Sequence, residues 1–466
     1  MTAVPVIAIF DIGKTNKKCF LIDEQYQIVL ERSVQFEEMT DEDGDACDDV
    51  NMLTQWIETS LSEILQLKEF DVKAVNFSAY GASLVYTNDT GKVIAPLYNY
   101  LKSYPEKIEN ELYGKYGGAE KISTETASPV LGSLNSGMQL YRMKIEKPEL
   151  YSQVRYALHL PQYISFIVSQ KAYSDITSIG CHTQLWNFQK NRYHDWVIAE
   201  GLEKKLAPLR SSGETNIIHH NNKVLHTGIG LHDSSAALIP YLAVFKEPFV
   251  LISTGTWCIS LNPFNDEPLT SAELAQDCLC YMEYQDRPVK ASRLFAGQDH
   301  ELQTKRLAAY FNTTPDAYKE IKYNGTVIQD LKNKFDFDTS VTTGDNISGS
   351  VFQTRELDAF ANYEEAYHCL MLDIMQQQLH ATKLVLSNSP VNRIFVDGGF
   401  GNNSVYMHLL AQAFPAQEVY AASVAQATAM GAALAVHHAW NPKPLPADMV
   451  KLKYYKVIDL ADHGVL

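Results

Sequence analysis

The sequence has 466 residues, of which 46% are hydrophobic and 20% charged, as in a soluble globular protein of about three domains or two large ones. Its formal net charge of -16 at pH 7 argues against a nucleic-acid-binding surface and against docking on an anionic membrane. No uninterrupted apolar run reaches the length of about 18 residues that a transmembrane helix needs, so none is expected.

The N-terminal region lacks a basic segment before its first apolar run, so a signal peptide is not expected. The seven cysteines are scattered along the chain. Their one close pair, Cys278 and Cys280, has C-x-C spacing, which is not that of a zinc ribbon. We therefore expect reduced thiols and a cytoplasmic protein.

Residues 5–36 are predicted to form three strands, with turns at Asp11–Asn16 and Asp23–Gln25. The first turn carries a carboxylate, the Thr15 hydroxyl and backbone N–H groups around Gly13. These groups suit a metal-bound polyphosphate, because N–H and O–H groups donate to phosphate oxygens and a carboxylate holds Mg²⁺ or its waters. A plain β-hairpin with a polar turn is the alternative, and this stretch alone does not decide between the two.

The run Glu37–Asp49 holds eight acidic residues in thirteen and is expected to be a solvated loop. Its Asp41-x-Asp43-x-Asp45 pattern resembles the start of a calcium loop. Ala46 and Met52, however, stand where an EF-hand has Gly and Glu, so an EF-hand is excluded.

Strands and helices then alternate, which indicates an α/β protein. In chain order the patterns predict an amphipathic helix over 53–65, a buried strand over 72–78, a hairpin over 85–95, a largely helical stretch over 104–170, a polar loop over 175–186 and an irregular strand or loop over 217–226.

A glycine turn at 228–230 leads into a helix of small residues with Asp233 at its start. Asp233 alone could be a helix N-cap as well as a general base. Pro240 and Pro248 bracket a predicted boundary between two domains, residues 1–244 and residues 245–466.

Beyond this boundary, Phe249–Leu261 repeats the opening pattern of strand, polar turn and strand. Aligning Gly255 with Gly13 sets Thr256 against Lys14 and predicts two halves built on one plan. Helices are predicted over most of 298–387, with a polar interruption near 337–350. A buried strand over 393–397, a helix from about Asn403 and an alanine-rich helix over 425–436 follow.

Four polar segments each follow an apolar strand, at the edge of the sheet where α/β folds bind ligands. They are Asp11–Thr15, Gly230–Asp233, Ser253–Thr256 and Asp397–Gly399. Two facing turns would clamp a polyphosphate, Asp233 would take a proton from a hydroxyl, and the last glycine turn would bind a nucleoside. Each segment alone also fits a structural turn, but together they predict phosphoryl transfer.

Several motifs in this order resemble those of the FGGY-type carbohydrate kinases, and most of all their rhamnulokinase branch. They are Asp11-Ile12-Gly13-Lys14-Thr15-Asn16, His182-Thr183-Gln184-Leu185, His232-Asp233, Ser253-Thr254-Gly255-Thr256-Trp257, and Gly398-Gly399 with Asn403.

The resemblance implies an α/β fold of two ribonuclease H-like, actin-like ATPase domains with a nucleotide and sugar cleft between them. It implies ATP and Mg²⁺ as cofactors and Asp233 as the general base. The implied substrate is a small ketose or deoxyketose similar to L-rhamnulose or L-fuculose. The implied site residues are Asp11 for the metal; Gly13, Lys14, Thr15, Asn16, Gly255 and Thr256 for phosphates; Gly398, Gly399 and Asn403 for adenosine; and Ser78, Tyr80, Gly81, His182, Gln184 and Asp233 for the sugar.

Departures from the family pattern fall mainly on the sugar side, where Ser78 and Ser83 replace two carboxylates. Lys14 replaces a threonine, and it would either contact phosphates or point to solvent. Tyr80 and Trp186 would be sugar contacts or core aromatics. A catalytically inactive sugar-binding or regulatory homologue, an actin-like ATPase without a sugar acceptor, and a homodimer all remain open.

Overall fold

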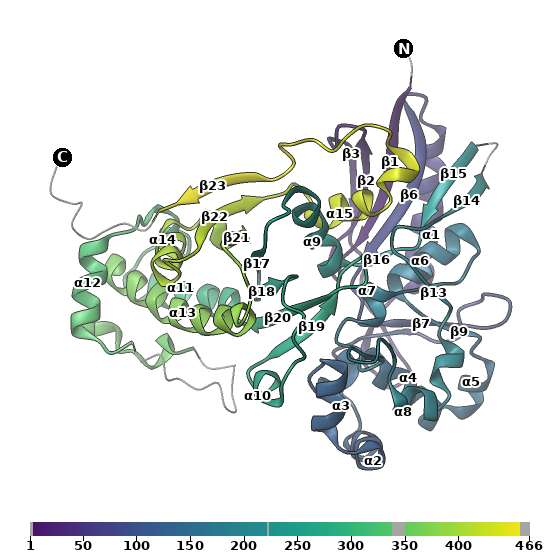
Figure 1. The fold of residues 1–466 in the computed structure, drawn as a ribbon, viewed down its shortest axis with the longest axis horizontal. Coiled ribbons are helices and arrows are strands. Elements are labelled where there is room, and N and C mark those ends of the chain that lie inside the picture. The colour runs from purple at the N-terminus through teal and green to yellow at the C-terminus, as the bar shows by residue number, and fades with distance from the viewer. Residues whose placement is uncertain (1–2, 221–222, 338–349, 457–466) are drawn as a thin grey trace.

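The computed structural model describes residues 3–220, 223–337 and 350–456 and is built around two seven-stranded sheets (Figure 1). The first sheet has the order β14-β15-β6-β1-β2-β3, with β16 also paired to β6. Its strands are β1 (Val4–Ile12), β2 (Lys17–Asp23), β3 (Ile28–Val34), β6 (Phe70–Ala79), β14 (Thr215–His220), β15 (Lys223–Gly228) and β16 (Leu231–His232). The three predicted opening strands are confirmed, whereas 217–226 belongs to a regular hairpin of β14 and β15.

The second sheet has the order β19-β20-β18-β17-β21-β22-β23. Its strands are β17 (Phe249–Thr254), β18 (Cys258–Asn262), β19 (Cys278–Met282), β20 (Pro288–Leu294), β21 (Arg393–Gly398), β22 (Glu418–Ser423) and β23 (Lys451–Tyr455). Each sheet contains three consecutive antiparallel strands followed by parallel ones: β3-β2-β1 with β6 and β15, and β20-β18-β17 with β21 and β22. The predicted repetition of one plan is therefore confirmed.

Side chains of β1 alternate between two cores, because successive residues of a strand point to opposite faces. Val6, Ala8 and Phe10 pack with residues of α1 (Val50–Gln66) and α6 (Leu160–Ser169). Ile7 and Ile9 pack with residues of α9 (Asp233–Val244) and α15 (Ala427–Ala435). The first sheet is thus covered on one face by a helix from the far end of the chain, as Figure 1 shows for the yellow α15 beside β1 and β2.

Close contact between α9 and α15 depends on two residues with special backbones. Pro240 lies inside α9 and has no N–H to donate to the Ala236 carbonyl four residues earlier. That carbonyl oxygen faces Gly431 of α15, where an added Cβ would lie 1.8 Å from it. Pro240 therefore allows a close contact between these two helices. The division into residues 1–244 and 245–466 stays a prediction.

Helices around the second sheet lie where the pattern predicts them over 298–387, except that 338–349 falls outside the described residues. They are α11 (Ala296–Tyr310), α12 (Gly325–Lys334) and α13 (Tyr363–Leu386). Outside that range lie α10 (Ser271–Leu274), α14 (Ser404–Ala413) and α16 (His437–Trp440), the last of which contributes Trp440 to the core of the first sheet.

Residues 84–212 add a smaller, mainly helical part beside the first sheet. Its elements are β7 (Leu84–Thr87), β8 (Leu97–Tyr98), α2 (Glu106–Tyr116), α3 (Ala119–Thr126), α4 (Ser136–Glu146), α5 (Pro148–Gln153), β9 (Tyr156–His159), β10 (Ser174–Asp175), α7 (Ile176–Ile179), β11 (Trp186–Asn187), β12 (Arg192–Tyr193), α8 (Asp195–Ala199) and β13 (Leu209–Arg210). The predicted hairpin over 85–95 is reduced to one bridge between Thr87 and Val93, because β7 pairs with β9 instead.

All seven cysteines are buried and unpaired. Over the described ranges, no helix combines the length and the apolar character needed to cross a membrane.

The acidic run is mostly exposed, as its composition predicts, but it also contains ordered structure that was not predicted. Two short strands, β4 (Met39–Thr40) and β5 (Ala46–Asp48), form a small sheet with β8. Between them, one Asp41 carboxylate oxygen accepts hydrogen bonds from the backbone N–H groups of Asp43 and Asp45, at 2.9 and 3.0 Å. The run therefore needs a nearby positive charge to fold.

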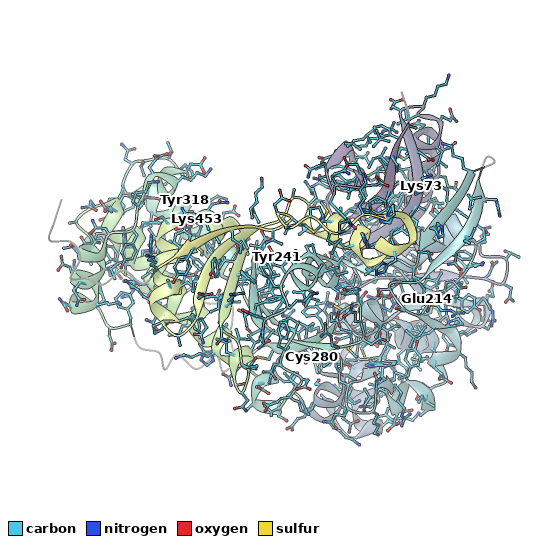
Figure 2. All side chains as sticks on the ribbon, turned by 45° about the horizontal axis from the view of Figure 1, so that its top comes forward. Lys73, Glu214, Tyr241, Cys280, Tyr318 and Lys453 are labelled. Carbon is cyan, nitrogen blue, oxygen red and sulfur yellow. The ribbon has the colours of Figure 1, made fainter. Side chains whose placement is uncertain are left out.

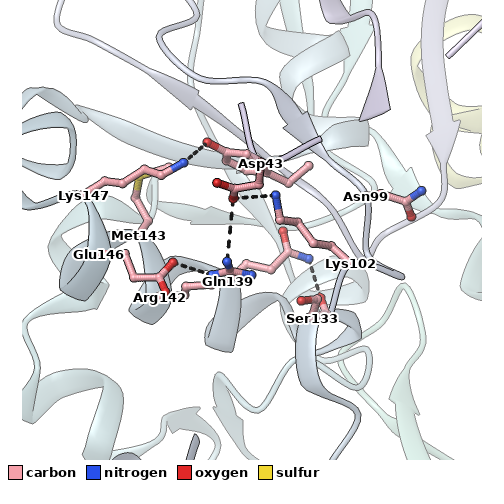
Figure 3. Close-up of a pocket in the computed structure, with 10 residues that line it drawn as sticks. Asp43, Asn99, Lys102, Ser133, Gln139, Arg142, Met143, Glu146 and Lys147 are labelled. Atoms are coloured by element: carbon pink, nitrogen blue, oxygen red, sulfur yellow. Dashed lines mark hydrogen bonds and ion pairs between the residues drawn. The ribbon is translucent and has the colours of Figure 1, made fainter. Parts of the chain in front are cut away.

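Lys102 supplies that charge. Its Nζ atom lies 2.5 Å from Asp41, 2.8 Å from Asp43 and 3.1 Å from Asp45, and only 5% of its side chain is exposed. Burial alone would lower the pKa of Lys102, but hydrogen bonds to the three carboxylates outweigh burial and raise it. Arg142 also approaches Asp43, at 3.8 Å, beside a small cavity of about 40 Å³ (Figure 3). The ammonium group of Lys102 thus lies among the aspartates whose spacing resembles the start of a calcium loop.

Replacing Lys102 with alanine should open this loop, because removing one partner of a buried ion pair costs about 3 kcal/mol. Hydrogen exchange of residues 39–48 should accelerate by about 100-fold. Lys107→Ala, which removes an ammonium group with an exposed side chain and a 3.9 Å contact, is the matched control and should leave exchange unchanged. Equal exchange in both variants would contradict the assignment.

Candidate active site

The first polar turn joins β1 to β2, and Asp11 stands near the end of β1. Asp11 pairs with Lys18 of β2 on one side and with Ser78 of β6 on the other. The turn is closed by a 2.9 Å hydrogen bond from the Gly13 N–H to the Asn16 carbonyl. The geometry thus sets one carboxylate at the sheet edge beside a tight turn.

Lys14 in this turn does not adopt either of the two orientations left open by the sequence. Its Nζ atom lies 2.7 Å from carboxylate oxygens of both Asp48 and Glu38. Tyr80 donates a 2.7 Å hydrogen bond to the same Asp48 oxygen. Burial opposes ionisation of Asp48, but the hydrogen bonds from Lys14 and Tyr80 outweigh it and hold the pKa below its ordinary value. The folded acidic run therefore neutralises Lys14, whose contact with a nucleotide stays a prediction.

The rest of the turn is open to solvent. Thr15 and Asn16 are exposed, and Asn16 accepts a 2.8 Å hydrogen bond from Gln35. Lys17, which the motif analysis did not select, is buried and donates to the Lys14 carbonyl at 2.7 Å. Lys17 therefore fixes the shape of the turn while leaving the Thr15 hydroxyl free to contact a ligand.

Asp233 is the first residue of α9, directly after β16. Its Oδ1 atom accepts a 2.6 Å hydrogen bond from the Ser234 N–H and lies 3.3 Å from Nε2 of His232. Protein atoms surround the carboxyl in the cleft, although 36% of the side chain remains accessible. Asp233 follows the N-cap position, which His232 occupies. The carboxylate thus faces the positive end of a helix dipole.

Asp11 and Asp233 lie close enough for their charges to interact, and the pKa of each carboxyl is raised. Burial and the charge of Asp233 raise the pKa of Asp11 to about 7, and Lys18 opposes only part of this effect. Burial raises the pKa of Asp233 to about 6 against the hydrogen bonds from Ser234. Both groups are held in an environment that disfavours their charged forms.

A cavity of about 210 Å³ joins Asp233 to the second half of the chain. Ser253 of β17, Asp397 of β21 and Thr428 of α15 line it together with Asp233 and Tyr281. Tyr241 of α9 crosses between the halves and donates a 2.7 Å hydrogen bond to Asp397 (Figure 2). Burial also raises the pKa of Asp397, against the hydrogen bonds from Tyr241 and Gly398. Three of the four predicted polar segments thus meet at one cavity.

The second polar turn is held to the last glycine turn by Thr254. Its hydroxyl donates to the Asp397 carbonyl at 2.6 Å and accepts from the Phe400 N–H at 3.1 Å. Gly398 has φ +91°, and a Cβ there would lie 1.9 Å from the Thr254 carbonyl oxygen. Only glycine fits at this position. Ser253, Gly255 and Thr256 beside it remain exposed.

A larger pocket of about 810 Å³ opens beyond these turns. It is lined by Gly255, Gly399 and Asn403, as the sequence predicts for a nucleotide site. Asn403 is also the N-cap of α14, and its amide donates to Tyr367 at 2.6 Å.

Sequence reasoning missed several residues that line the same pocket: Gly297, His300, Glu301, Thr304, Lys305, Asp316, Tyr318, Lys319 and Lys322. Tyr318 is labelled in Figure 2 and lies on the second half of the molecule. Gly297 has a local reason to be glycine, because a Cβ would lie 1.7 Å from the Gly255 carbonyl oxygen. No motif marked the other residues, which come from the amphipathic helix α11 and a loop.

The predicted sugar residues differ in how accessible they are. Ser78 is fully buried, and its hydroxyl has no hydrogen-bond partner among the described residues. Gly81 lies against the ring of His232, where a Cβ would approach to 2.3 Å. His182 faces the same ring, with centroids 6.1 Å apart. These three residues surround the segment that carries Asp233.

Gln184 and the aromatic candidates lie deeper. Gln184 is 1% exposed and accepts a 3.0 Å hydrogen bond from Tyr113, which favours a structural role, so its contact with a sugar stays a prediction. Trp186 belongs to a buried cluster of the helical part, and Tyr80 packs in the core beneath the first sheet. Of the two interpretations left open, their burial favours core packing.

Mg²⁺ prefers carboxylate and water oxygens, and Asp11, Asp233 and Asp397 offer carboxylates around the cleft. Asp233 and Asp397 line one cavity, and Asp11 lies close enough to Asp233 for its pKa to respond to that charge. Carboxylate oxygens of this kind suit a hard divalent cation.

Comparison with known proteins agrees with this geometry. Residues 6–237 match the N-terminal domain of the FGGY family of carbohydrate kinases, and residues 246–444 match the FGGY C-terminal domain. A rhamnulokinase of Mannheimia succiniciproducens is 22% identical over 284 residues. That match covers 58% of this chain and 57% of the relative, so the chain spans little more than half of its length.

Solved structures share the fold over almost the whole chain. A carbohydrate kinase from Novosphingobium aromaticivorans has a TM-score of 0.81 and 23% identity, covering 98% of this chain and 96% of that protein. Plasmodium falciparum glycerol kinase with ADP has a TM-score of 0.73 and 14% identity, covering 94% and 90%. The predicted two-domain α/β kinase fold is confirmed. Because the two domain matches span most of the sequence, the chain belongs to the FGGY family of carbohydrate kinases.

Proposed function

We propose that this protein transfers the γ-phosphoryl group of ATP to a hydroxyl of a small ketose or deoxyketose, with Asp233 as the general base. The observation that carries the proposal is the 210 Å³ cavity in which Asp233 meets Ser253 and Asp397. A kinase needs a base beside the phosphates, and this cavity joins the carboxylate of one half to the phosphate turn of the other. The proposed domains are residues 1–244, with the sugar and the base, and residues 245–466, with the nucleotide.

In this mechanism the adenosine end lies in the 810 Å³ pocket, near Gly399 and Asn403. Thr15, Thr256 and the backbone N–H groups of both turns donate to the phosphates, and Gly398 allows the closest approach of the backbone. Asp11, with Asp233 and Asp397 nearby, would hold Mg²⁺, which neutralises phosphate charge when bound. Local donors are needed because the net charge of -16 repels a polyphosphate at long range.

Asp233 accepts the proton of the sugar hydroxyl as the oxygen attacks the γ-phosphorus. Its pKa of about 6 suits this task, because the carboxyl is ionised at neutral pH and still basic enough to take a proton. The neutral ring of His232, whose pKa burial lowers to about 4, borders the carboxylate without adding a charge. Closure of the two halves would exclude water as a competing acceptor.

The proposed substrate class rests on the resemblance to rhamnulokinases and on the neutral character of the residues around His182 and Ser78. A panel of L-rhamnulose, L-fuculose, D-xylulose and glycerol with ATP and Mg²⁺, read by formation of the sugar phosphate, tests it. The expected result is transfer to one of the 6-deoxyketoses. Sugar binding without ATP consumption would favour the inactive homologue, and sugar-independent ADP release would favour an ATPase.

Asp233→Asn should lower kcat by about 10²–10⁴-fold, because the amide cannot accept the proton, while ATP binding persists. The measurement is sugar phosphate formation at saturating substrates together with ATP affinity by calorimetry. Asp89→Asn, at a side chain that is 89% exposed, is the control and should keep normal turnover. Near-normal turnover of Asp233→Asn would disprove the assignment of the base.

The pH profile offers an independent check. At saturating MgATP, kcat/KM for the sugar should fall by about tenfold per pH unit below a pKa near 6, because the base must lose its proton before it acts. Activity should be lost on the acid side of this pKa, and Asp233→Asn should remove this dependence of kcat/KM on pH. A wild-type profile that stays flat down to the ordinary aspartate range, about pH 4, would contradict the raised pKa.

A further inference from the structure

A cluster of metal-ligand side chains lies beside Asp233, and one of its members, Cys181, has no role in the proposed reaction. Cys181 and His182 follow α7, and His232 ends β16. One ligand atom of each lies within 4.8 Å of those of the other two, and Cys181 Sγ is 3.4 Å from His232 Nε2. Cys181 is 1% exposed and His232 is 4% exposed, so the cluster is enclosed by protein.

The chemistry of these donors differs from that of the carboxylates in the cleft. A sulfur and two imidazole nitrogens suit Zn²⁺ and similar thiophilic ions, whereas Mg²⁺ takes oxygen ligands. A neutral imidazole ring offers a nitrogen lone pair to a metal, and Cys181 binds as the thiolate, so occupation of the cluster releases the thiol proton.

Two further observations point to a missing ligand. Within the described residues, Nδ1 of His182 is buried without a hydrogen-bond partner, which is rare for buried polar atoms. His182 also has φ +39°, and a 2.7 Å hydrogen bond from Asn135 to its carbonyl holds this left-handed backbone. Strained residues of this kind gather at functional sites.

The surrounding residues hold the rings in place. The His232 ring stacks on Tyr281 at 6.0 Å with an interplanar angle of 18°, and the absent side chain of Gly81 leaves room for its edge. Tetrahedral zinc has Zn–N bonds of about 2.0 Å and a Zn–S bond of about 2.3 Å, so ligand atoms within 4.8 Å of one another need to approach by roughly 1 Å.

We propose that Cys181, His182 and His232 form a binding site for a thiophilic divalent ion such as Zn²⁺, and that its occupation inhibits the enzyme. Asp233 Oδ1 lies 3.3 Å from His232 Nε2 and is available as the fourth ligand. A metal held there withdraws the carboxylate from its role as base and engages His182, which is predicted to face the sugar. The inhibitory half of this inference rests on the proposed function, whereas the binding half does not.

Binding is tested with Co²⁺, added in one equivalent to tag-free, full-length protein without nucleotide. The expected result is a thiolate-to-cobalt charge-transfer band in the near ultraviolet. Cys181→Ala should abolish the band, and Cys369→Ala, which removes another buried thiol in the second half, should retain it. Cys181→Ser, a closer replacement, keeps the test valid if the alanine variant does not fold. A band that survives loss of the Cys181 thiol, or no band in the wild type, would overturn the site.

Inhibition is tested by phosphorylation assays with buffered free Zn²⁺ and excess Mg²⁺. Each variant is compared with its own metal-free rate, and Cys181→Ala should need more than about tenfold higher free Zn²⁺ for half inhibition than the wild type or Cys369→Ala. Equal sensitivity in all three proteins would overturn the inhibitory half. A cobalt band in a protein that phosphorylates none of the sugars would support the metal site and refute the proposed function instead.

Discussion

Contact between α9 and α15 is the constraint on which the rest of the molecule depends. The two helices meet where Pro240 leaves the Ala236 carbonyl without its helical partner and where Gly431 leaves room for that oxygen. Asn76 of β6 adds a 2.8 Å hydrogen bond to the Ala432 carbonyl. Since α9 begins with Asp233 and α15 brings Thr428 to the same cavity, this packing sets the Asp233 carboxylate against the second half.

Electrostatics in the cleft follow from this packing. Three carboxylates are gathered where water is limited, and each has a raised pKa. The protein supplies no strong counter-charge there, although it supplies two lysines to Asp48 a short distance away. Cations are thus used to fold the acidic run and to shape the first turn, while the cleft is left for charges that arrive with the substrate.

The fold was largely predictable, because strand alternation and glycine turns are local signals. The opening three strands, the repeated strand pair at 249–261 and the helices of 298–337 all follow from patterns within about ten residues. The motif turns at Gly13, Gly255 and Gly398 were found for the same reason. Only part of the lining of the 810 Å³ pocket was predicted, because Tyr318 and His300 reach it from elements whose sequence is that of an ordinary helix and loop.

Other features depend on distant partners and could not be read from the chain. The ordered structure within the acidic run was missed, because its counter-ion, Lys102, lies 61 residues beyond Asp41. Lys14 looked available to contact a ligand, because its carboxylate partners are also distant in the sequence. The part that Pro240 plays in a helix contact could not be predicted, because nothing near it in the sequence reveals that α15 returns to cover α9. Gln184 matches a family motif, yet its hydrogen bond to Tyr113 shows how little a motif says about accessibility.

The return of α15 has a consequence for the newly made chain. One face of the first sheet, which includes Ile7 and Ile9, is completed by residues 429–440. At synthesis rates of about 5–20 residues per second, the nearly 200 residues between α9 and this segment take roughly 10–40 s to emerge. During that time the N-terminal sheet carries an uncovered apolar surface on the ribosome. The first half thus finishes folding only after most of the second half has been made, and until then its apolar face needs protection from aggregation.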